Sequence, residues 1–331
     1  MARRVLVVGA TGQLGNDLVR RLSVVGHRVR AFVRRSSDTT ALRALDIELA
    51  FGDLADRASV EAACADVGAV AATASSIVPG RGDRFGEFDV GWYENLLHAC
   101  RRQQVAQFVY ISAFTSAHDE RIPEFCIKRR IEALIAQSGI AYTIFRGAAF
   151  MDVYFAAMGS SIPLCGVTSP TLDRSFWATR LLRKTTGTLI EHNGLAIIPG
   201  SGRTRHAFIA STDVAAFMAG AVARDDAMNR VFDIGGPEAL SWDSVAATFA
   251  DLLGRNVTPL HLPISLFRAI RWSMQRTSPA TANLLAVLEL IGSVDYVHDS
   301  APAARMFGVR LTSVRNFLAA RLRDEAVLPT R

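Results

Sequence analysis

Short apolar runs rich in β-branched residues alternate with helical periodicity over the first 150 residues of the chain. Strands are predicted at 5–10, 28–33, 47–52, 69–75, 107–113 and 142–147, and the clearest helices between them at 15–25, 59–65 and 88–102. This alternation is typical of βαβ units, whose strands lie parallel. Each connection is long enough for a right-handed crossover. The pattern therefore predicts an α/β fold with a doubly wound parallel sheet.

The alternation weakens after residue 150. Strands are expected at 206–212 and 230–236, with Asp213 capping the helix between them. Ser241 should cap another helix that Gly254 closes, and helices with polar turns follow from Pro259 onward. We therefore expect a core at 1–150 and a smaller, mainly helical substrate lobe at 151–331, with 206–236 returning to the core sheet. Such a lobe would cover the carboxyl edge of the sheet, where ligands bind in this architecture.

The composition indicates a globular chain: half of its 331 residues are hydrophobic and 21% are charged. Its net charge of +6 comes from scattered arginine pairs, such as Arg101-Arg102, and not from one basic stripe. No nucleic-acid partner is expected, and a site for phosphorylated ligands is the alternative explanation. The late apolar stretch at 283–294 contains Glu289 and is shorter than the roughly 20 residues of a membrane span.

The cysteines and the N-terminal residues indicate the cellular compartment in which the protein is expected. Cys64, Cys100, Cys126 and Cys165 lie singly in apolar stretches, without the spacing of metal ligands. They are interpreted as reduced core residues, and no metal site is expected. The chain enters its first strand pattern without a signal peptide, so a cytoplasmic protein is expected.

The first strand ends in VLVVGATGQLG, which places Gly9, Gly12 and Gly15 at the spacing of a phosphate-binding loop. The first glycine permits a tight turn, the second lets the backbone approach a pyrophosphate, and the third lets the helix pack close to the strand. Free N–H groups at the helix start attract the anion. Cofactor contacts are therefore predicted for Gly9, Thr11, Gly12, Gln13, Leu14 and Gly15. An ordinary glycine turn is the alternative.

The ends of the second and third predicted strands are expected to extend the cofactor site. Strand two ends in Val33, Arg34 and Arg35, where an NAD site would carry an acidic residue. A basic position suits a 2′-phosphate, so NADP(H) is predicted with Arg34 as the main clamp. Solvated arginines are the alternative, and it is a stronger one for Arg35. After strand three, Asp53 is expected to bond the adenine edge, or else to cap a turn. Leu54 should pack near that ring.

Together these residues resemble a family. GATGQLG, VRR, GDLAD, YISA at 110–113 and KRRIEALIAQSGIAYTIFRGAAFMD at 128–152 are similar to the short-chain dehydrogenase superfamily. The similarity is closest to its atypical NmrA-like branch, which includes isoflavone-reductase-like and complex I accessory-subunit-like proteins. It implies a Rossmann-type fold, an NADP(H) preference and a small substrate lobe. It also implies that Thr73, Ala74 and Ser75 run along the cofactor, mainly through backbone atoms.

The resemblance also marks a missing residue. Ordinary members use Tyr-x-x-x-Lys, with the Tyr as proton donor and the Lys on the nicotinamide ribose. Here Lys128 is present, but Glu124 stands four residues before it. Lys128 is predicted as a ribose contact and candidate acid/base, or else as one half of an exposed Glu124–Lys128 pair worth about 0.2–0.5 kcal/mol. Ser112 is a second candidate donor, or a strand-end cap.

Other positions are less defined. Asn95 lies where ordinary members carry a structural or catalytic Asn, and Arg146-Gly147 departs from the family's Arg-Pro. Phe150, Tyr154 and Trp177 are expected to bind the substrate, although Tyr154 also suits simple packing.

The leading hypothesis for function is an NADPH-dependent reductase of a lipophilic carbonyl, quinone or polarised double bond. A non-catalytic NADP(H)-binding sensor or assembly subunit is the alternative. A nucleotide-sugar or sterol-modifying enzyme is less favoured, because that chemistry normally keeps the Tyr. An oligomer is compatible with either hypothesis.

Overall fold

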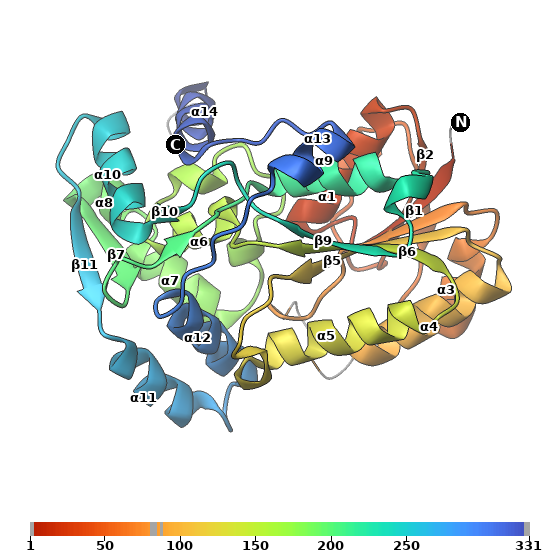
Figure 1. The fold of residues 1–331 in the computed structure, drawn as a ribbon, viewed down its shortest axis with the longest axis horizontal. Coiled ribbons are helices and arrows are strands. Elements are labelled where there is room, and N and C mark those ends of the chain that lie inside the picture. The colour runs from red at the N-terminus through yellow and green to blue at the C-terminus, as the bar shows by residue number, and fades with distance from the viewer. Residues whose placement is uncertain (1–2, 80–84, 87–88, 328–331) are drawn as a thin grey trace.

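A seven-stranded parallel sheet forms the centre of the molecule (Figure 1). The computed structural model describes residues 3–79, 85–86 and 89–327. The strand order is β3-β2-β1-β4-β5-β6-β9. The strands are β1 (Arg4–Val8), β2 (Arg28–Val33), β3 (Glu48–Phe51), β4 (Ala69–Ala72), β5 (Gln107–Ala113), β6 (Ala141–Gly147) and β9 (Arg230–Ile234). The six strands expected in the first 150 residues are thus confirmed, and β1 and β4 end earlier than expected because the chain leaves the sheet there.

Helices cover both faces of this sheet. They are α1 (Gln13–Val24), α2 (Thr40–Arg43), α3 (Arg57–Cys64), α4 (Asp89–Arg102), α5 (Pro123–Ala136), α9 (Ser211–Ala221) and α13 (Ala301–Phe307). In Figure 1, α1, α9 and α13 lie above the sheet and α3, α4 and α5 below it. Phe88, where the third helix was expected to begin, lies outside the described residues.

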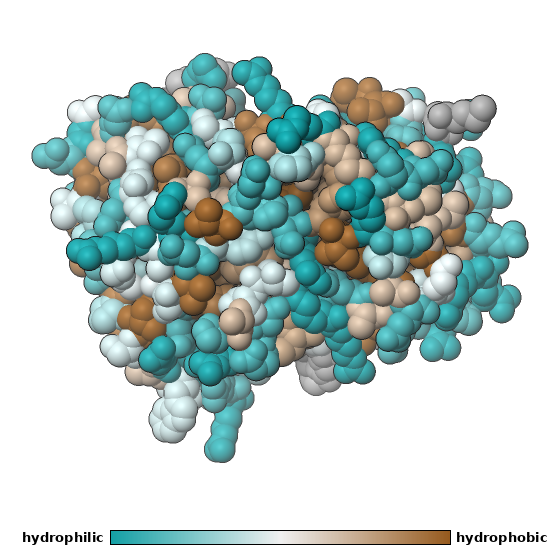
Figure 2. All heavy atoms as spheres, viewed as in Figure 1, coloured by the Kyte–Doolittle hydropathy of each residue, from teal (hydrophilic) through white to brown (hydrophobic). Residues whose placement is uncertain are grey.

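Strand alternation explains these two layers. Val5 and Val7 belong to the apolar cluster beneath α1 and α9, whereas Leu6 and Val8 belong to the cluster against α3 and α4. Successive strand side chains point to opposite faces, so a strand buried on both sides must be apolar throughout. On the molecular face of Figure 2, the hydrophobic side chains form small separate groups among hydrophilic ones.

The second lobe is built around a third apolar cluster that includes Phe155, Trp242 and Phe249. Its helices are α6 (Met151–Ala157), α7 (Trp177–Thr186), α8 (Leu189–Asn193), α10 (Trp242–Leu253), α11 (Ile264–Met274), α12 (Pro279–Ile291) and α14 (Val314–Val327). Two small sheets pair β7 (Leu195–Pro199) with β11 (Thr258–Leu262) and β8 (Arg205–His206) with β10 (Leu240–Ser241). Short 3-10 turns lie at Asp119–Arg121, Ile162–Leu164, Thr171–Asp173 and Asp225–Ala227.

The predicted caps of α10 are confirmed. The Ser241 hydroxyl accepts a hydrogen bond from the Ser244 N–H at 3.1 Å, and Gly254 ends the helix in the left-handed conformation at φ +61°. This is the pairing of a hydroxyl N-cap with a glycine after the last turn.

The prediction for 206–212 is wrong in most of its length. Only Arg205–His206 is a strand, and it pairs with β10 outside the main sheet; of 206–236, only Arg230–Ile234 joins that sheet. Asp213 does not cap the helix, because α9 begins at Ser211, whose N–H donates to the Asp152 carboxylate of α6. The Asp213 carboxylate instead accepts from the N–H and the hydroxyl of Thr312.

Asp17 of α1 lies near Asp152 and Arg321, and this group of charged residues gives a first testable prediction. Asp17 accepts a hydrogen bond from the Ser211 hydroxyl at 2.9 Å, and burial raises its pKa to about 6, aided by nearby Asp152 and opposed by Arg321. The folded state holds this proton more tightly than the unfolded chain does. That contribution to stability is present below the ordinary Asp pKa of about 4 and is lost as the pH rises through about 6.

We expect Asp17→Asn to raise the free energy of unfolding at pH 7 by about 1–3 kcal/mol, with little gain at pH 4. Urea denaturation at both pH values measures it. Asp46→Asn changes an exposed aspartate and is the control. An equal gain at pH 4 and pH 7 would contradict the role of ionisation.

Candidate functional site

A cavity of about 1070 Å³ lies along the carboxyl edge of the sheet. One end is lined by Arg34, Asp53 and Leu54 at the ends of β2 and β3, the middle by the loop between β1 and α1, and the other end by side chains of the second lobe. The sheet order reverses between β1 and β4, and this reversal creates the crevice in which doubly wound folds bind ligands.

The glycine loop is tightly packed. Gly9 has φ +87°, and a Cβ there would lie 2.7 Å from the Ala74 nitrogen. A Cβ on Gly15 would collide with the Gly9 carbonyl. The Gly12 N–H donates to the Gly9 oxygen at 3.0 Å, and α1 starts directly after Gly12, at Gln13. Side chains are thus excluded where the backbone and the helix start face the cavity, together with Thr11 and Leu14.

A segment of the second lobe closes over this loop. The Thr171 N–H donates to Gln13 Oε1 at 3.1 Å, while the buried Gln13 Nε2 has no partner among the described residues. The guanidinium of Arg174 donates to the Val78 carbonyl and lies beside Gly12, where a Cβ would be 3.1 Å from its Nη2. Arg174 could not be predicted from a local pattern, because its contact with Gly12 joins residues 162 positions apart.

The two arginines after β2 have different surroundings. Arg34 lines the cavity, whereas the exposed Arg35 lies outside the lining with its guanidinium 6.0 Å from the Phe51 ring centre. Asp53 lines the cavity and accepts from the Ala55 N–H at 2.9 Å, as the turn-capping alternative expected, while its bond to the adenine edge stays a prediction.

The segment after β4 presents its backbone to the cavity. The Thr73 hydroxyl donates to the Val8 carbonyl at 3.1 Å, and Ser75 donates to the buried Asp89 at 3.3 Å. The Ala74 carbonyl accepts from the Tyr93 hydroxyl. The two hydroxyls are thus used within the protein, while Thr73, Ala74 and Ser75 all line the cavity.

Lys128 is buried, with 8% of its surface exposed, so the exposed Glu124–Lys128 pair is wrong. Helix α5 begins at Pro123 as expected and turns Lys128 inward under β5. Its Nζ donates to the Ile111 carbonyl at 3.2 Å and lies 5.1 Å from the Tyr110 ring centre. Burial lowers the pKa of Lys128, and Glu124, Asp89 and Glu132 oppose that shift. Lys128 and Glu124 both line the cavity.

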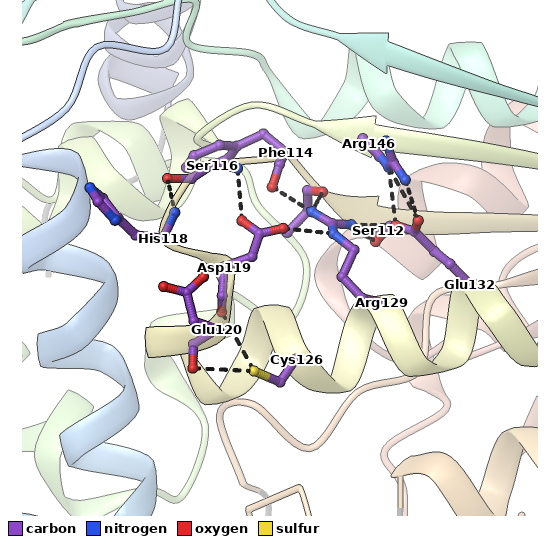
Figure 3. A network of polar contacts seen from close by, with 11 residues as sticks. Ser112, Phe114, Ser116, His118, Asp119, Glu120, Cys126, Arg129, Glu132 and Arg146 are labelled. Atoms are coloured by element: carbon purple, nitrogen blue, oxygen red, sulfur yellow. Dashed lines mark hydrogen bonds and ion pairs between the residues drawn. The ribbon is translucent and has the colours of Figure 1, made fainter.

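Ser112 is tied into an ion-pair network (Figure 3). Its hydroxyl oxygen accepts a hydrogen bond from Arg129 Nη1 at 3.1 Å. Glu132 is paired with Arg129 and with Arg146. Arg129 also donates to the Ala113 and Phe114 carbonyls and pairs with Asp119. Ser112 lines the cavity, but its hydroxyl oxygen is hydrogen-bonded to Arg129 of the ion-pair network. This contact favours a structural role for the hydroxyl.

The far end of the cavity is apolar. It is lined by Phe114, Phe125, Phe150, Val153, Tyr154, Leu172, Leu284, Leu285 and Leu288. Burial raises the pKa of the Tyr154 hydroxyl, whose ring packs edge-on against Trp242. Trp177 is 51% exposed and does not line this cavity, because it begins α7 on the outer side, whereas Ala178 and Leu182 face inward.

Three other expectations are resolved by contacts. Asn95 donates to the Leu54 carbonyl and accepts from Arg57, so it joins α4 to the neighbouring loop. Gly147 lines the cavity, and a Cβ there would lie 3.1 Å from the Phe150 ring. Cys64 and Cys100 are buried as expected, whereas Cys126 is exposed because it lies on the outer face of α5.

The described part of the chain lacks two structural features. No described helix is long and apolar enough to cross a membrane. Within residues 3–79, 85–86 and 89–327, no group of three or more His, Cys, Asp or Glu is arranged to hold a metal ion.

The parallel sheet and the glycine loop at its switch point define a Rossmann-type protein. The chain belongs to the NmrA-like family, whose model matches residues 1–316.

Three comparisons describe its relatives. The photosystem II assembly factor Ycf39 of Synechocystis sp. is 26% identical over 92% of this chain and 86% of that protein. Sterol demethylase protein B of Methylococcus capsulatus is 44% identical over 111 residues, which are 33% of this chain and 34% of that protein. The NADPH-complexed quinone oxidoreductase QOR2 of Escherichia coli superposes with a TM-score of 0.73 at 21% identity, covering 96% of this chain and 99% of that one.

Proposed function

We propose that this protein is an NADPH-dependent reductase of a lipophilic carbonyl compound, quinone or polarised double bond. The observation that carries the proposal is the continuity of the cavity, from Arg34 past the glycine loop to Lys128 and then to an apolar end. A dinucleotide and a small apolar molecule would meet beside Lys128. The Escherichia coli structure named as a quinone oxidoreductase and the Methylococcus relative named for sterol demethylation support a lipophilic substrate.

The residues present fit NADP(H). Gly9 and Gly15 allow the loop and the start of α1 to pack closely, and Gly12 carries no side chain that would stand beside a pyrophosphate. Gln13 lines the cavity, and its buried Nε2 has no partner among the described residues. Thr11, Leu14, Asp53, Leu54, Thr73, Ala74 and Ser75 line the remaining path. Arg34 would hold the 2′-phosphate, and Arg174 adds positive charge beside the glycine loop. When bound, the reduced cofactor supplies a hydride.

The chain would supply orientation and exclusion of water. Lys128, fixed by the Ile111 carbonyl, would hold the nicotinamide ribose. Phe150 and Tyr154 would bind the substrate in the apolar end. Water-poor surroundings strengthen electrostatic interactions and suppress side reactions of a hydride donor.

The proposal is tested by following NADPH oxidation with a panel of quinones, enones and ketones. Oxidation with at least one compound class is expected. A protein that binds NADPH tightly but oxidises it with no member of the panel would overturn the reductase proposal.

Arg34→Ala tests the choice of cofactor. We expect the Kd for NADPH to rise about 10–100-fold while the Kd for NADH changes little, since only NADPH carries the 2′-phosphate. Isothermal titration calorimetry of both nucleotides measures this. Arg35→Ala is the matched control and should weaken NADPH binding much less, because Arg35 lies outside the cavity lining. Equal losses for NADPH and NADH would contradict a 2′-phosphate clamp.

A non-catalytic NADP(H)-binding sensor or assembly subunit is the second candidate. The observation that favours it is the similarity to Ycf39 of Synechocystis, named as an assembly factor, over 92% of this chain. A sensor should bind NADP+ and NADPH with clearly different affinities and co-purify with a partner. Similar affinities, together with NADPH oxidation on the panel, would decide for the reductase.

A further inference from the structure

Glu124 lies in the cavity wall one helical turn before Lys128. Buried Asn283 of α12 holds it, since its Oδ1 accepts from the Glu124 N–H at 2.9 Å and its Nδ2 donates to Glu124 Oε2 at 3.2 Å. The other carboxyl oxygen, Oε1, receives no hydrogen bond from any residue that the structure describes. The second lobe therefore fixes the carboxyl group in place and leaves one oxygen to the contents of the cavity.

The surroundings of Glu124 favour its protonated form. Burial raises the pKa of Glu124, and Asp89 raises it further, while Lys128 and the Asn283 amide act in the opposite direction. The start of α5 also favours the charged form, but burial is the largest cause. The neighbouring phenols of Tyr110 and Tyr154 have raised pKa values and stay neutral. A neutral carboxyl group thus persists to higher pH here than on an exposed glutamate.

We propose that Glu124 is the proton donor of the reaction, an inference that rests on the proposed reductase function. As the hydride from the reduced nicotinamide forms a bond to the carbonyl carbon, the π pair moves to the carbonyl oxygen. The carboxyl O–H bond of Glu124 breaks and its proton passes to that oxygen. The products are an alcohol, the oxidised nicotinamide and the Glu124 carboxylate. Lys128 stabilises this carboxylate until solvent reprotonates it.

Two other hydroxyls in the cavity wall are weaker candidates. The Ser112 hydroxyl oxygen accepts from Arg129, which draws it toward the ion-pair network, and an aliphatic hydroxyl is a much weaker acid than a carboxyl group. The raised pKa of Tyr154 makes its phenol a poorer acid, whereas the shift of Glu124 brings its acidity closer to neutral pH. Geometry and acidity therefore both favour Glu124.

The first test needs no turnover. Asp17, Asp152 and Asp213 also have raised pKa values, so the readout is the infrared titration of wild type minus that of Glu124→Gln. This difference should show a protonated carboxyl component that persists above the pH range of exposed glutamates. Glu120→Gln, which changes an exposed glutamate on the preceding 3-10 turn, should keep that component. A Glu124→Gln spectrum that lacks no such component relative to wild type would overturn the proposal.

The second test uses a substrate found in the panel. Glu124→Gln should lower kcat about 100-fold or more, with NADPH affinity by calorimetry kept within about threefold, and Glu124→Asp should restore part of the rate. The wild-type rate should fall as rising pH deprotonates Glu124. A Glu124→Gln rate equal to that of wild type, or a large loss in Tyr154→Phe instead, would overturn the acid role and leave the reductase proposal standing. A wild-type protein that reduces nothing on the panel would overturn both.

Discussion

Gly15→Ala is expected to raise the Kd for NADPH at least about 100-fold, which corresponds to about 2.8 kcal/mol. Gly15 lies in the first turn of α1, and an added Cβ would lie 2.7 Å from the Gly9 carbonyl carbon and 2.9 Å from the Ala10 Cα. Both neighbours are backbone atoms and cannot rotate away. The start of α1 must then move off the end of β1, carrying the N–H groups of the loop with it. Calorimetric titration with NADPH measures the loss.

The matched control for this variant is Gly91→Ala. Gly91 is exposed on α4, and a Cβ there would meet no atom within 4 Å. This change should leave NADPH binding intact and stabilise the protein by about 0.5–1 kcal/mol, because alanine suits a helix better. Unchanged NADPH affinity in Gly15→Ala would mean that close packing of α1 on β1 does not shape the cofactor site.

The core strands could be predicted because each is apolar on both faces and is bounded by turn residues. Val5 to Val8 are buried on alternating sides, so the run carries its own signal whatever packs against it. Residues 206–212 show a similar apolar pattern, but most of this segment does not form a strand. Its Ala207 N–H donates to the Tyr296 carbonyl and its Ile209 N–H to the Ala149 carbonyl. Those distant partners, invisible in a local pattern, divide the segment between a short strand and a helix.

The residues of the candidate site also fall into two groups, those that a local sequence pattern predicts and those whose position depends on distant parts of the chain. The glycine loop and the ends of β2 to β4 are local in the sequence, and the residues predicted there line the cavity, with the exception of Arg35. Glu124 looked like a solvent-facing partner of Lys128, because α5 has charged residues on several sides. Its half-buried position depends on α12, about 160 residues later, whose Asn283 forms hydrogen bonds with it. A polar Asn inside an apolar stretch was the one sequence signal for that contact.

Trp177 shows the reverse case. An aromatic residue in the second lobe suggested a pocket wall, but the rotation of α7 turns Ala178 and Leu182 to the cavity and leaves Trp177 outside. One residue of helical register, about 100°, decides which side chain faces inward. The register was not fixed by the sequence, because α7 is amphipathic with exposed apolar residues such as Leu181.

Lys128→Met is expected to lower kcat about 100-fold or more without loss of stability. Methionine fills a similar volume, and it removes a charge whose burial is unfavourable, as the lowered pKa of Lys128 indicates. The melting temperature should therefore stay the same or rise. Steady-state kinetics on a panel substrate and thermal denaturation measure the two effects. Arg130→Met, two residues along α5 and exposed, is the control and should leave both nearly unchanged.

The pH profile links Lys128 to Glu124, and the comparison of kcat with NADPH affinity separates the two roles proposed for Lys128. Its charge lowers the pKa of Glu124, so its removal should raise that pKa further and move the alkaline fall of the remaining rate to higher pH. If Lys128 mainly holds the nicotinamide ribose, the Kd for NADPH should rise while kcat at saturating NADPH changes little. If its charge also serves the proton transfer, kcat should fall more than the affinity does. An unmoved profile with full activity and unchanged NADPH affinity would contradict both roles, because a buried lysine in the wall of the cavity would then act on neither the cofactor nor Glu124.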